Sequence, residues 1–161
     1  MKNGVQMSRN SKLVTGRKKY LSAIIDLYDR SIVAYILSSK NDNKLVMDTI
    51  KLAMKRNPKV KPVIHSDRGF QYTSHAYRDL KNKFGFKVSM SRVAKCLDNQ
   101  PIESFWGILK AEYYYLHSFV SEKELIRGIH NYINFYQHER IITKFNSLTP
   151  SEYRNKAINE A

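Results

Sequence analysis

One stretch of the chain decides the fold: Pro62-Val63-Ile64-His65-Ser66-Asp67-Arg68-Gly69. Its apolar half predicts a buried strand over 62–65, bounded by a proline and by turn-forming residues. Asp67 then falls just past the end of that strand. A carboxylate in this place suits a ligand site at the edge of a sheet, but it also suits a turn before Gly69. This stretch alone leaves both interpretations open.

A second acid stands in an equally unusual setting, in Asp98-Asn99-Gln100-Pro101-Ile102-Glu103-Ser104-Phe105. Pro101 suits the first turn of a helix, where its missing N–H costs nothing. Glu103 would lie in that first turn, with 35 residues between it and Asp67. Taken alone, Glu103 could be an ordinary exposed helix acid.

Outward from these acids, strand patterns alternate with helix patterns. Asn41 and Asp42 can cap a helix that stops before Pro58, Gly85 suits a helix end, and Ser121 with Glu124 suits a capping box. The expected order is strand 19–26, strand 31–37, helix 42–57, strand 62–65, helix 74–84, strand 86–91, a helix from residue 101 and a helix from 121 to about 138. This order predicts an α/β fold with a mixed sheet.

Composition narrows the class of partner. The 161 residues include 28 Lys and Arg against 14 Asp and Glu, a net charge of +14. This excess suits a polyanion such as nucleic acid, or simply a solvated basic surface. No apolar run approaches the length of a membrane span, so we expect no membrane partner. The single cysteine, Cys96, cannot form an internal disulfide and indicates a reducing cytoplasm.

The sequences around the two acids identify a family. Together with four further segments they resemble the integrase core domain of bacterial insertion-sequence transposases, which are relatives of retroviral integrases. The resemblance runs from about Lys19 to Arg154. It is carried by His65-Ser66-Asp67-Arg68-Gly69-Phe70-Gln71-Tyr72-Thr73-Ser74, Ser89-Met90-Ser91-Arg92, Asp98-Asn99, Pro101-Ile102-Glu103-Ser104-Phe105, Phe105-Trp106-Gly107-Ile108-Leu109-Lys110-Ala111-Glu112 and Ser147-Leu148-Thr149-Pro150-Ser151-Glu152-Tyr153-Arg154.

The resemblance implies a ribonuclease-H-like mixed sheet flanked by helices, and metal-dependent DNA cleavage and strand transfer in transposition. It implies that Asp67 and Glu103 are catalytic and bind Mg²⁺ or Mn²⁺. Carboxylates suit these hard cations. The implied partners are double-stranded DNA, both transposon ends and target, and further copies of the chain on that DNA. The implied location is the bacterial cytoplasm, at the nucleoid.

Four other residues are expected to contact DNA. Lys110 follows Glu103 by seven positions and therefore shares its helix face, where a cation can hold a phosphate. It could equally be a solvated lysine. Asn99 could orient a phosphate or cap the helix, and Arg92 could contact the DNA backbone or lie free on the surface. Arg68, next to Asp67, completes the expected set.

The first acid of the family's Asp, Asp, Glu triad has no counterpart. Counting back from the 19–26 strand puts Gln6-Met7-Ser8-Arg9 in its place, and residues 1–25 contain no Asp or Glu. Met7 is a soft ligand that suits Mg²⁺ poorly. The first acid of the chain, Asp26, is expected at the far end of its strand. A catalytically defective DNA-binding remnant of a transposase is therefore the alternative to an active core.

We expect residues 1–18 to be a degenerate leader that replaces the first-strand region, 19–154 to be the core domain and 155–161 a tail. The missing upstream parts of a full transposase favour an N-terminally truncated reading frame. The slot between strands 19–26 and 61–66 is nevertheless central in the implied fold. Unpaired backbone groups there would each cost roughly 1–3 kcal/mol. Part of residues 3–14 should therefore enter the slot as a strand, which places Met7 on the side of Asp67 and Glu103.

Overall fold

The computed structural model describes residues 4–15, 17–66, 69–90 and 100–160. The side chains that it describes are those of 19–66, 69–89 and 100–160.

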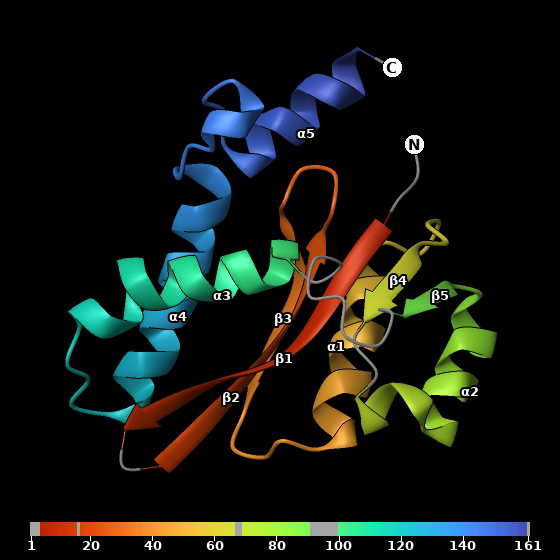
Figure 1. Ribbon diagram of the computed structural model, residues 1–161, viewed down its shortest axis with the longest axis horizontal. Helices are drawn as coiled ribbons and strands as arrows, with labels where there is room; N and C mark the ends of the chain where they lie inside the picture. Colours follow the sequence, from red (N-terminus) through yellow and green to blue (C-terminus); the bar gives the residue numbers. More distant parts are fainter. Residues whose placement is uncertain (1–3, 16, 67–68, 91–99, 161) are drawn as a thin grey trace.

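A five-stranded mixed sheet forms the centre of the molecule (Figure 1), in the order β3-β2-β1-β4-β5. The first three strands are antiparallel neighbours, whereas β4 and β5 run parallel to β1. This confirms the expected α/β class with a mixed sheet. The strands are β1 (Gly4–Thr15), β2 (Arg17–Asp26), β3 (Ile32–Ser38), β4 (Val63–Ser66) and β5 (Lys87–Met90).

Strand β1 fills the central slot, as backbone hydrogen bonding requires. Met7 lies opposite Ile24 of β2 on one side and opposite Ser66 of β4 on the other. The register shifts between Ser8 and Ser11, within the polar stretch that made this segment a poor strand by propensity. The prediction that this segment pairs in the slot is confirmed, because two flanking edges outweigh weak propensity. A domain boundary at residue 18 stays a prediction.

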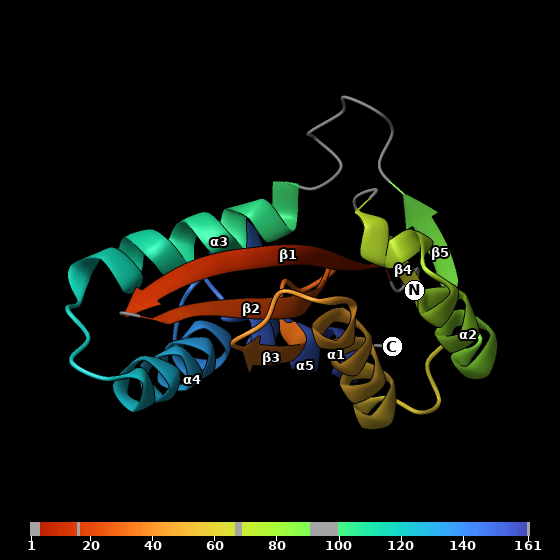
Figure 2. The same ribbon diagram turned by 90° about the horizontal axis from the view of Figure 1, so that it is seen from below.

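Two hydrophobic cores cover the sheet, and β2 contributes alternate residues to them. Ile24 packs in one core with helices α1 and α2, while Ala23 and Ile25 pack in the other with α3 and α4. This alternation is the period of a strand buried on both faces. Figure 2 shows α3 lying along β1. The helices are α1 (Asn43–Arg56), α2 (His75–Phe84), α3 (Gln100–Glu112), α4 (Glu122–His138) and α5 (Pro150–Asn159).

The helix ends follow their capping residues, with one difference from expectation. Asp42 caps α1, and Gly85 ends α2 with a φ of 69°. Ser121 accepts from the backbone N–H of Glu124, but the Glu124 carboxylate accepts from Val120 rather than from Ser121. The expected box at α4 is therefore half formed. A complete box opens α5.

Two helical glycines should respond oppositely to alanine. A Cβ at Gly128 in α4 would lie 1.7 Å from the phenol oxygen of Tyr113, so Gly128→Ala forces the packed ring to move. We expect it to lower the free energy of unfolding by about 1–2 kcal/mol, overpacking being partly offset by helix propensity. A Cβ at Gly107 in α3 would meet no described residue within 4 Å, so Gly107→Ala should raise the free energy of unfolding by about 0.5–1 kcal/mol. Urea denaturation measures both, and a stable Gly128→Ala protein would contradict the packing.

Candidate functional site

Helix α3 presents Glu103 on an open face. Its buried side consists of Ile102, Phe105, Trp106 and Leu109, which pack on the sheet and on α4. Glu103 therefore faces outward and is exposed. It forms no ion pair with any side chain in the described part of the chain. An exposed carboxylate without a cation partner is free to bind one.

Lys110 and Gly107 complete that face of α3. Lys110 is partly exposed two turns after Glu103, as the spacing predicts, and makes no ion pair with a described residue. No described residue lies within 4 Å of the position where Gly107 would carry a Cβ. Gly107 is therefore no packing glycine, and it leaves room for a close approach to the helix backbone.

The end of α3 that carries Glu103 faces the same region as the carboxyl ends of β4 and β5 (Figures 1 and 2). Ser66, the last residue of β4, is buried between Met7 of β1 and Met90 of β5 in the register. Asp67 follows it directly in the sequence. Asp67 itself, together with Arg68, Arg92 and Asn99, lies outside the described residues.

Buried polar groups gather beneath this end of the sheet. Gln71 in the short 3₁₀ helix η1 (Phe70–Thr73) is fully buried, and neither atom of its amide has a partner among the described residues. Burial raises the pKa of Tyr77 to about 12. His65 Nδ1 lies 3.0 Å from Ser89 Oγ, which ties β4 to β5 and favours a structural role for this histidine. Sequence reasoning missed Gln71, although it stands four positions after Asp67.

Asp26 is engaged elsewhere. It pairs with Val5 of β1, two positions or about 7 Å along the strand from Met7. Arg154 Nη2 donates to its carboxylate at 2.9 Å, and burial is the main cause that raises the Asp26 pKa above 3.8. Asp26 is therefore not placed to supply the missing first acid.

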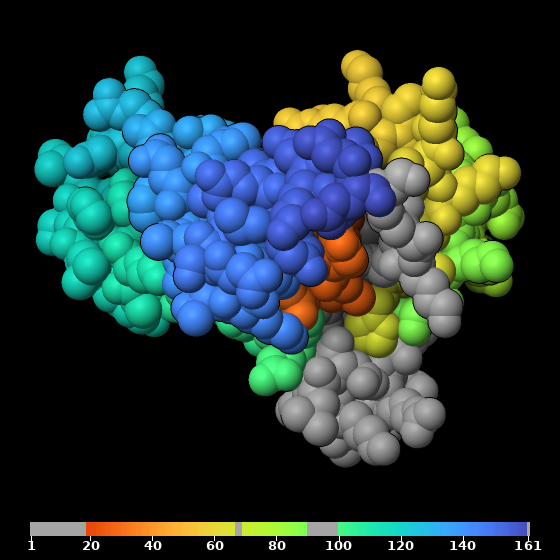
Figure 3. All heavy atoms as spheres, turned by 90° about the horizontal axis from the view of Figure 1, so that it is seen from above, coloured from red at the N-terminus to blue at the C-terminus, as the bar shows by residue number. Residues whose placement is uncertain are grey.

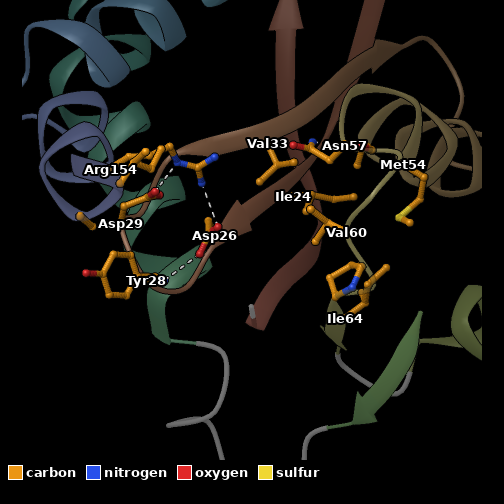
Figure 4. Close-up of a pocket in the computed structure, with 14 residues that line it drawn as sticks. Ile24, Asp26, Tyr28, Asp29, Val33, Met54, Asn57, Val60, Ile64 and Arg154 are labelled. Carbon is orange, nitrogen blue, oxygen red and sulfur yellow. Dashed lines mark hydrogen bonds and ion pairs between the residues drawn. The ribbon is translucent and has the colours of Figure 1, made fainter. Parts of the chain in front are cut away.

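Asp26 instead lines an apolar hollow of about 740 Å³ between β2, α1 and α5 (Figure 4). Asp29 and Arg154 are among its polar lining residues, and Ile24, Met54 and Ile64 are among its apolar ones. Figure 3 shows α5 lying beside the β2–β3 hairpin at this place. The hollow is thus separate from the face of Glu103. In the described part of the chain no three His, Cys, Asp or Glu residues gather as a metal site.

A second ionic contact fixes the other end of α3. The Arg140 guanidinium donates to both oxygens of Glu112, from Nη2 at 2.7 Å and from Nε at 2.9 and 3.0 Å. Tyr132 donates to the same carboxylate at 2.8 Å. These contacts, the arginine first, lower the Glu112 pKa. They hold the helix of Glu103 against α4, and no local pattern could have paired residues 28 positions apart.

Family models match most of the chain. Two models described as integrase core domain match residues 10–96 and 103–158. The chain belongs to the integrase core domain family. The identification made from the motifs around Asp67 and Glu103 is therefore confirmed.

Relatives of this integrase core are transposases. It is 42% identical over 144 residues to the putative transposase InsK for insertion sequence element IS150 of Escherichia coli, covering 89% of this chain and 51% of InsK. It is 40% identical over 142 residues to a transposase-like protein of Haemophilus influenzae, covering 88% of this chain and 66% of that one. The chain thus spans about half the length of InsK.

Solved structures confirm the ribonuclease-H-like fold of this integrase core. The HTLV-2 integrase catalytic core domain in complex with magnesium, in its trimeric form, matches with a TM-score of 0.73 at 14% identity, over 94% of this chain and 95% of that one. The BIV integrase catalytic core domain matches with a TM-score of 0.69 at 14% identity, over 99% of each chain. Among the described residues, no helix is long and apolar enough to cross a membrane.

Proposed function

We propose that this integrase core belongs to a polynucleotidyl transferase that cleaves and joins DNA strands in transposition and integration. The observation that carries the proposal is Glu103, which is exposed and forms no ion pair with a described residue. The end of α3 that carries it faces the carboxyl end of β4, which Asp67 follows in the sequence (Figure 1). The transposase relatives support it, since their identity extends over nearly the whole chain.

The donor chemistry at this edge fits a hard divalent cation. Glu103 and Asp67 would hold Mg²⁺ or Mn²⁺ through carboxylate oxygens, the ligands that these ions prefer. Such an ion would polarise a phosphodiester and lower the pKa of a bound water. Three described residues of α3 support this chemistry. Glu103 forms no ion pair with a described residue, Gly107 leaves space for a nucleic-acid backbone, and Lys110 offers a cation to a phosphate.

DNA would be held by Lys110, Arg68, Arg92 and Asn99, with transposon ends and target as substrates. Several copies of the chain would assemble on that DNA, in the bacterial cytoplasm at the nucleoid. The net charge of +14 supports this partner.

A second function has an observation of its own. The register brings Met7, a thioether, opposite Ser66, where the family's first acid is expected. Two carboxylates in place of three should hold one ion weakly, which favours a chain that binds DNA without cutting it. A nicking assay in Mn²⁺ separates the two functions. Robust cleavage that is lost in Asp67→Asn supports the transferase, and binding without cleavage supports the second function.

Salt should control DNA binding by this chain. We expect duplex affinity to fall by about a thousandfold or more between 50 and 200 mM salt, because each neutralised phosphate releases counterions. Lys110→Gln should reduce the slope of log affinity against log salt by about one. Lys55→Gln, an exposed lysine on α1, removes the same charge away from the site and should change the slope less.

Fluorescence anisotropy of a labelled duplex across a salt series measures both effects. Affinity that does not depend on salt would contradict an electrostatic interface. Equal slopes for the two lysine variants would show that Lys110 does not contact the DNA.

A further inference from the structure

A small basic hollow lies beside the first turns of α3. Its volume is about 280 Å³, the space of roughly nine water molecules. It is enclosed by the turn between β2 and β3, by α3 from Gln100 to Ile108, and by the end of α4 with the segment that follows it. The polar residues among those that line it are Arg30, Gln100, Ser104, Tyr136, Arg140 and Lys144, with no Asp or Glu.

Arg30 is held in this hollow by an unusual backbone. Its φ is +63°, in the left-handed region that glycine adopts without cost and that other residues rarely occupy. Two hydrogen bonds of 2.9 Å fix the turn, from Arg30 N–H to Asp26 C=O and from Asp26 N–H to Ser31 C=O. An arginine that persists where glycine fits better points to a role for its side chain.

The Arg30 guanidinium forms no ion pair with a described residue, and the Asp26 carboxylate acts on it only from a distance. Its Nη1 is buried and has no hydrogen-bond partner among the described residues. Burial of the group lowers the pKa of Arg30, which reflects the cost of a poorly solvated cation. A buried donor of this kind is stabilised by an acceptor, and an anion satisfies both the charge and the hydrogen bond.

The other lining groups add positive potential. Lys144 is exposed and makes no ion pair with a described residue. Arg140 is neutralised by Glu112, so Arg30 and Lys144 are the lining cations without an ion pair to a described residue. The N-terminal turn of α3, with Gln100 in the lining, contributes the positive end of the helix dipole. Two cations and a helix start around a hollow whose lining contains no Asp or Glu suit an oxyanion.

We propose that this hollow binds a non-reacting phosphate of the DNA backbone, next to the strand that meets Glu103. Ser104 lines the hollow and follows Glu103 on α3, about 100° round the helix and 1.5 Å along it. One DNA strand that crosses the start of α3 can therefore touch both faces. The hollow sets the position of the strand while Glu103 faces the phosphate to be cut. This inference rests on the proposed function, since that function supplies the DNA.

The test compares Arg30→Gly, Lys144→Gln and their double variant with Lys55→Gln. The control removes one positive charge from an exposed site on α1. Binding of a fluorescent duplex is measured by anisotropy between about 50 and 200 mM salt. Each hollow variant should weaken binding by about tenfold at low salt. Each should also lower the slope against log salt by about 0.9, and the control should do neither to that extent.

Thermal unfolding of the same variants shows that folding is intact. Arg30→Gly relieves the left-handed strain, so its midpoint should stay equal or rise by roughly 2–4 °C. If Arg30→Gly fails to fold, Arg30→Asn, which also tolerates this backbone, takes its place beside Lys144→Gln.

Three results would overturn the inference. If the hollow variants bind DNA as Lys55→Gln does, the hollow is not a phosphate site, while the proposed function is unaffected. If the wild-type chain binds no duplex even at low salt, both the phosphate site and the proposed function are contradicted. Inorganic phosphate that raises the unfolding midpoint of the wild type, but not of Arg30→Gly, while DNA affinity is the same in both, would assign the hollow to free phosphate instead.

Discussion

Met7→Asp is expected to give this chain Mn²⁺-dependent DNA cleavage at least about 100-fold faster than the unchanged sequence. This expectation rests on the register between β1 and β4. Met7 lies opposite Ser66, and Asp67 comes next in the chain, so an acid at position 7 would lie next to the strand end that Asp67 follows. A third carboxylate supplies the hard oxygen donor that a thioether does not.

The matched control is Gln6→Asp. Successive residues of a strand face opposite sides of the sheet, so an acid at 6 and an acid at 7 cannot serve the same site. Nicking of supercoiled plasmid in Mn²⁺ measures the rate. Cleavage by Met7→Asp should disappear when Asp67→Asn is added, which excludes a contaminating nuclease.

A second readout does not depend on activity. Three clustered carboxylates repel one another until a cation binds, so Mg²⁺ should raise the unfolding midpoint of Met7→Asp more than that of the wild type or of Gln6→Asp. An unchanged rate together with an unchanged response to Mg²⁺ would show that position 7 is not the place of the first acid.

Strand β1 shows how far sequence reasoning reaches. Its residues are poor strand formers, and propensity alone gave no reason to place them in the sheet. Backbone hydrogen bonding gave the reason, because the edges of β2 and β4 that face this slot both need hydrogen-bond partners. Most helix ends were equally predictable, since Asp42, Ser74 and Gly85 cap through contacts within a few residues.

Contacts between residues far apart in the chain could not be predicted from the sequence. Nothing local indicated that Arg140 would reach Glu112, or that Arg30 would take a left-handed backbone beside α3. The prediction of a capping box at Ser121 was half right, because the Glu124 carboxylate accepts its hydrogen bond from the backbone N–H of Val120 instead of from that of Ser121. The expected roles of Asp67 and Glu103 came from a resemblance. Of these two acids the structure describes only Glu103, which is exposed and forms no ion pair with a described residue.

Arg154 is the distant contact with the largest expected effect on stability. From α5 it donates through Nε to Asp29 at 2.5 Å and through Nη2 to Asp26 at 2.9 Å and to Ser31 at 3.0 Å. Figure 4 shows this guanidinium between the two carboxylates. The Asp29 side chain is 2% exposed, and that of Asp26 is 16% exposed. The contact joins the β2–β3 turn to the end of the chain.

Arg154→Ala should lower the free energy of unfolding by about 3 kcal/mol, because it leaves two close carboxylates without their cation. For a protein of this size that is a fall of roughly 6–12 °C in the unfolding midpoint. Lys156→Ala on the same helix is the control, since its pair with Glu160 spans 3.9 Å at the surface and should contribute almost nothing. Differential scanning calorimetry at neutral pH compares them.

Two further variants separate charge from packing. Arg154→Lys keeps the charge but loses the forked geometry that reaches two acids, so its midpoint should lie between those of wild type and Arg154→Ala. Adding Asp29→Asn to Arg154→Ala removes one buried charge and should recover part of the loss. A double variant no more stable than Arg154→Ala would show that the loss comes from packing of the arginine stem.

The loss of stability caused by Arg154→Ala should become smaller at acidic pH, and the pKa of Asp26 determines this direction. Burial raises the Asp26 pKa above 3.8, while Arg154 pulls it down. Without Arg154 the folded-state pKa rises further, so the folded protein binds this proton more tightly than the unfolded chain. Stability from that proton is present below pH 3.8 and is lost as the pH rises through the folded pKa. The difference in midpoint between Arg154→Ala and wild type should therefore narrow from pH 7 towards about pH 4. A gap that stays constant over this range would mean that Asp26 is ionised in both proteins throughout, and that its charge is not what Arg154 stabilises.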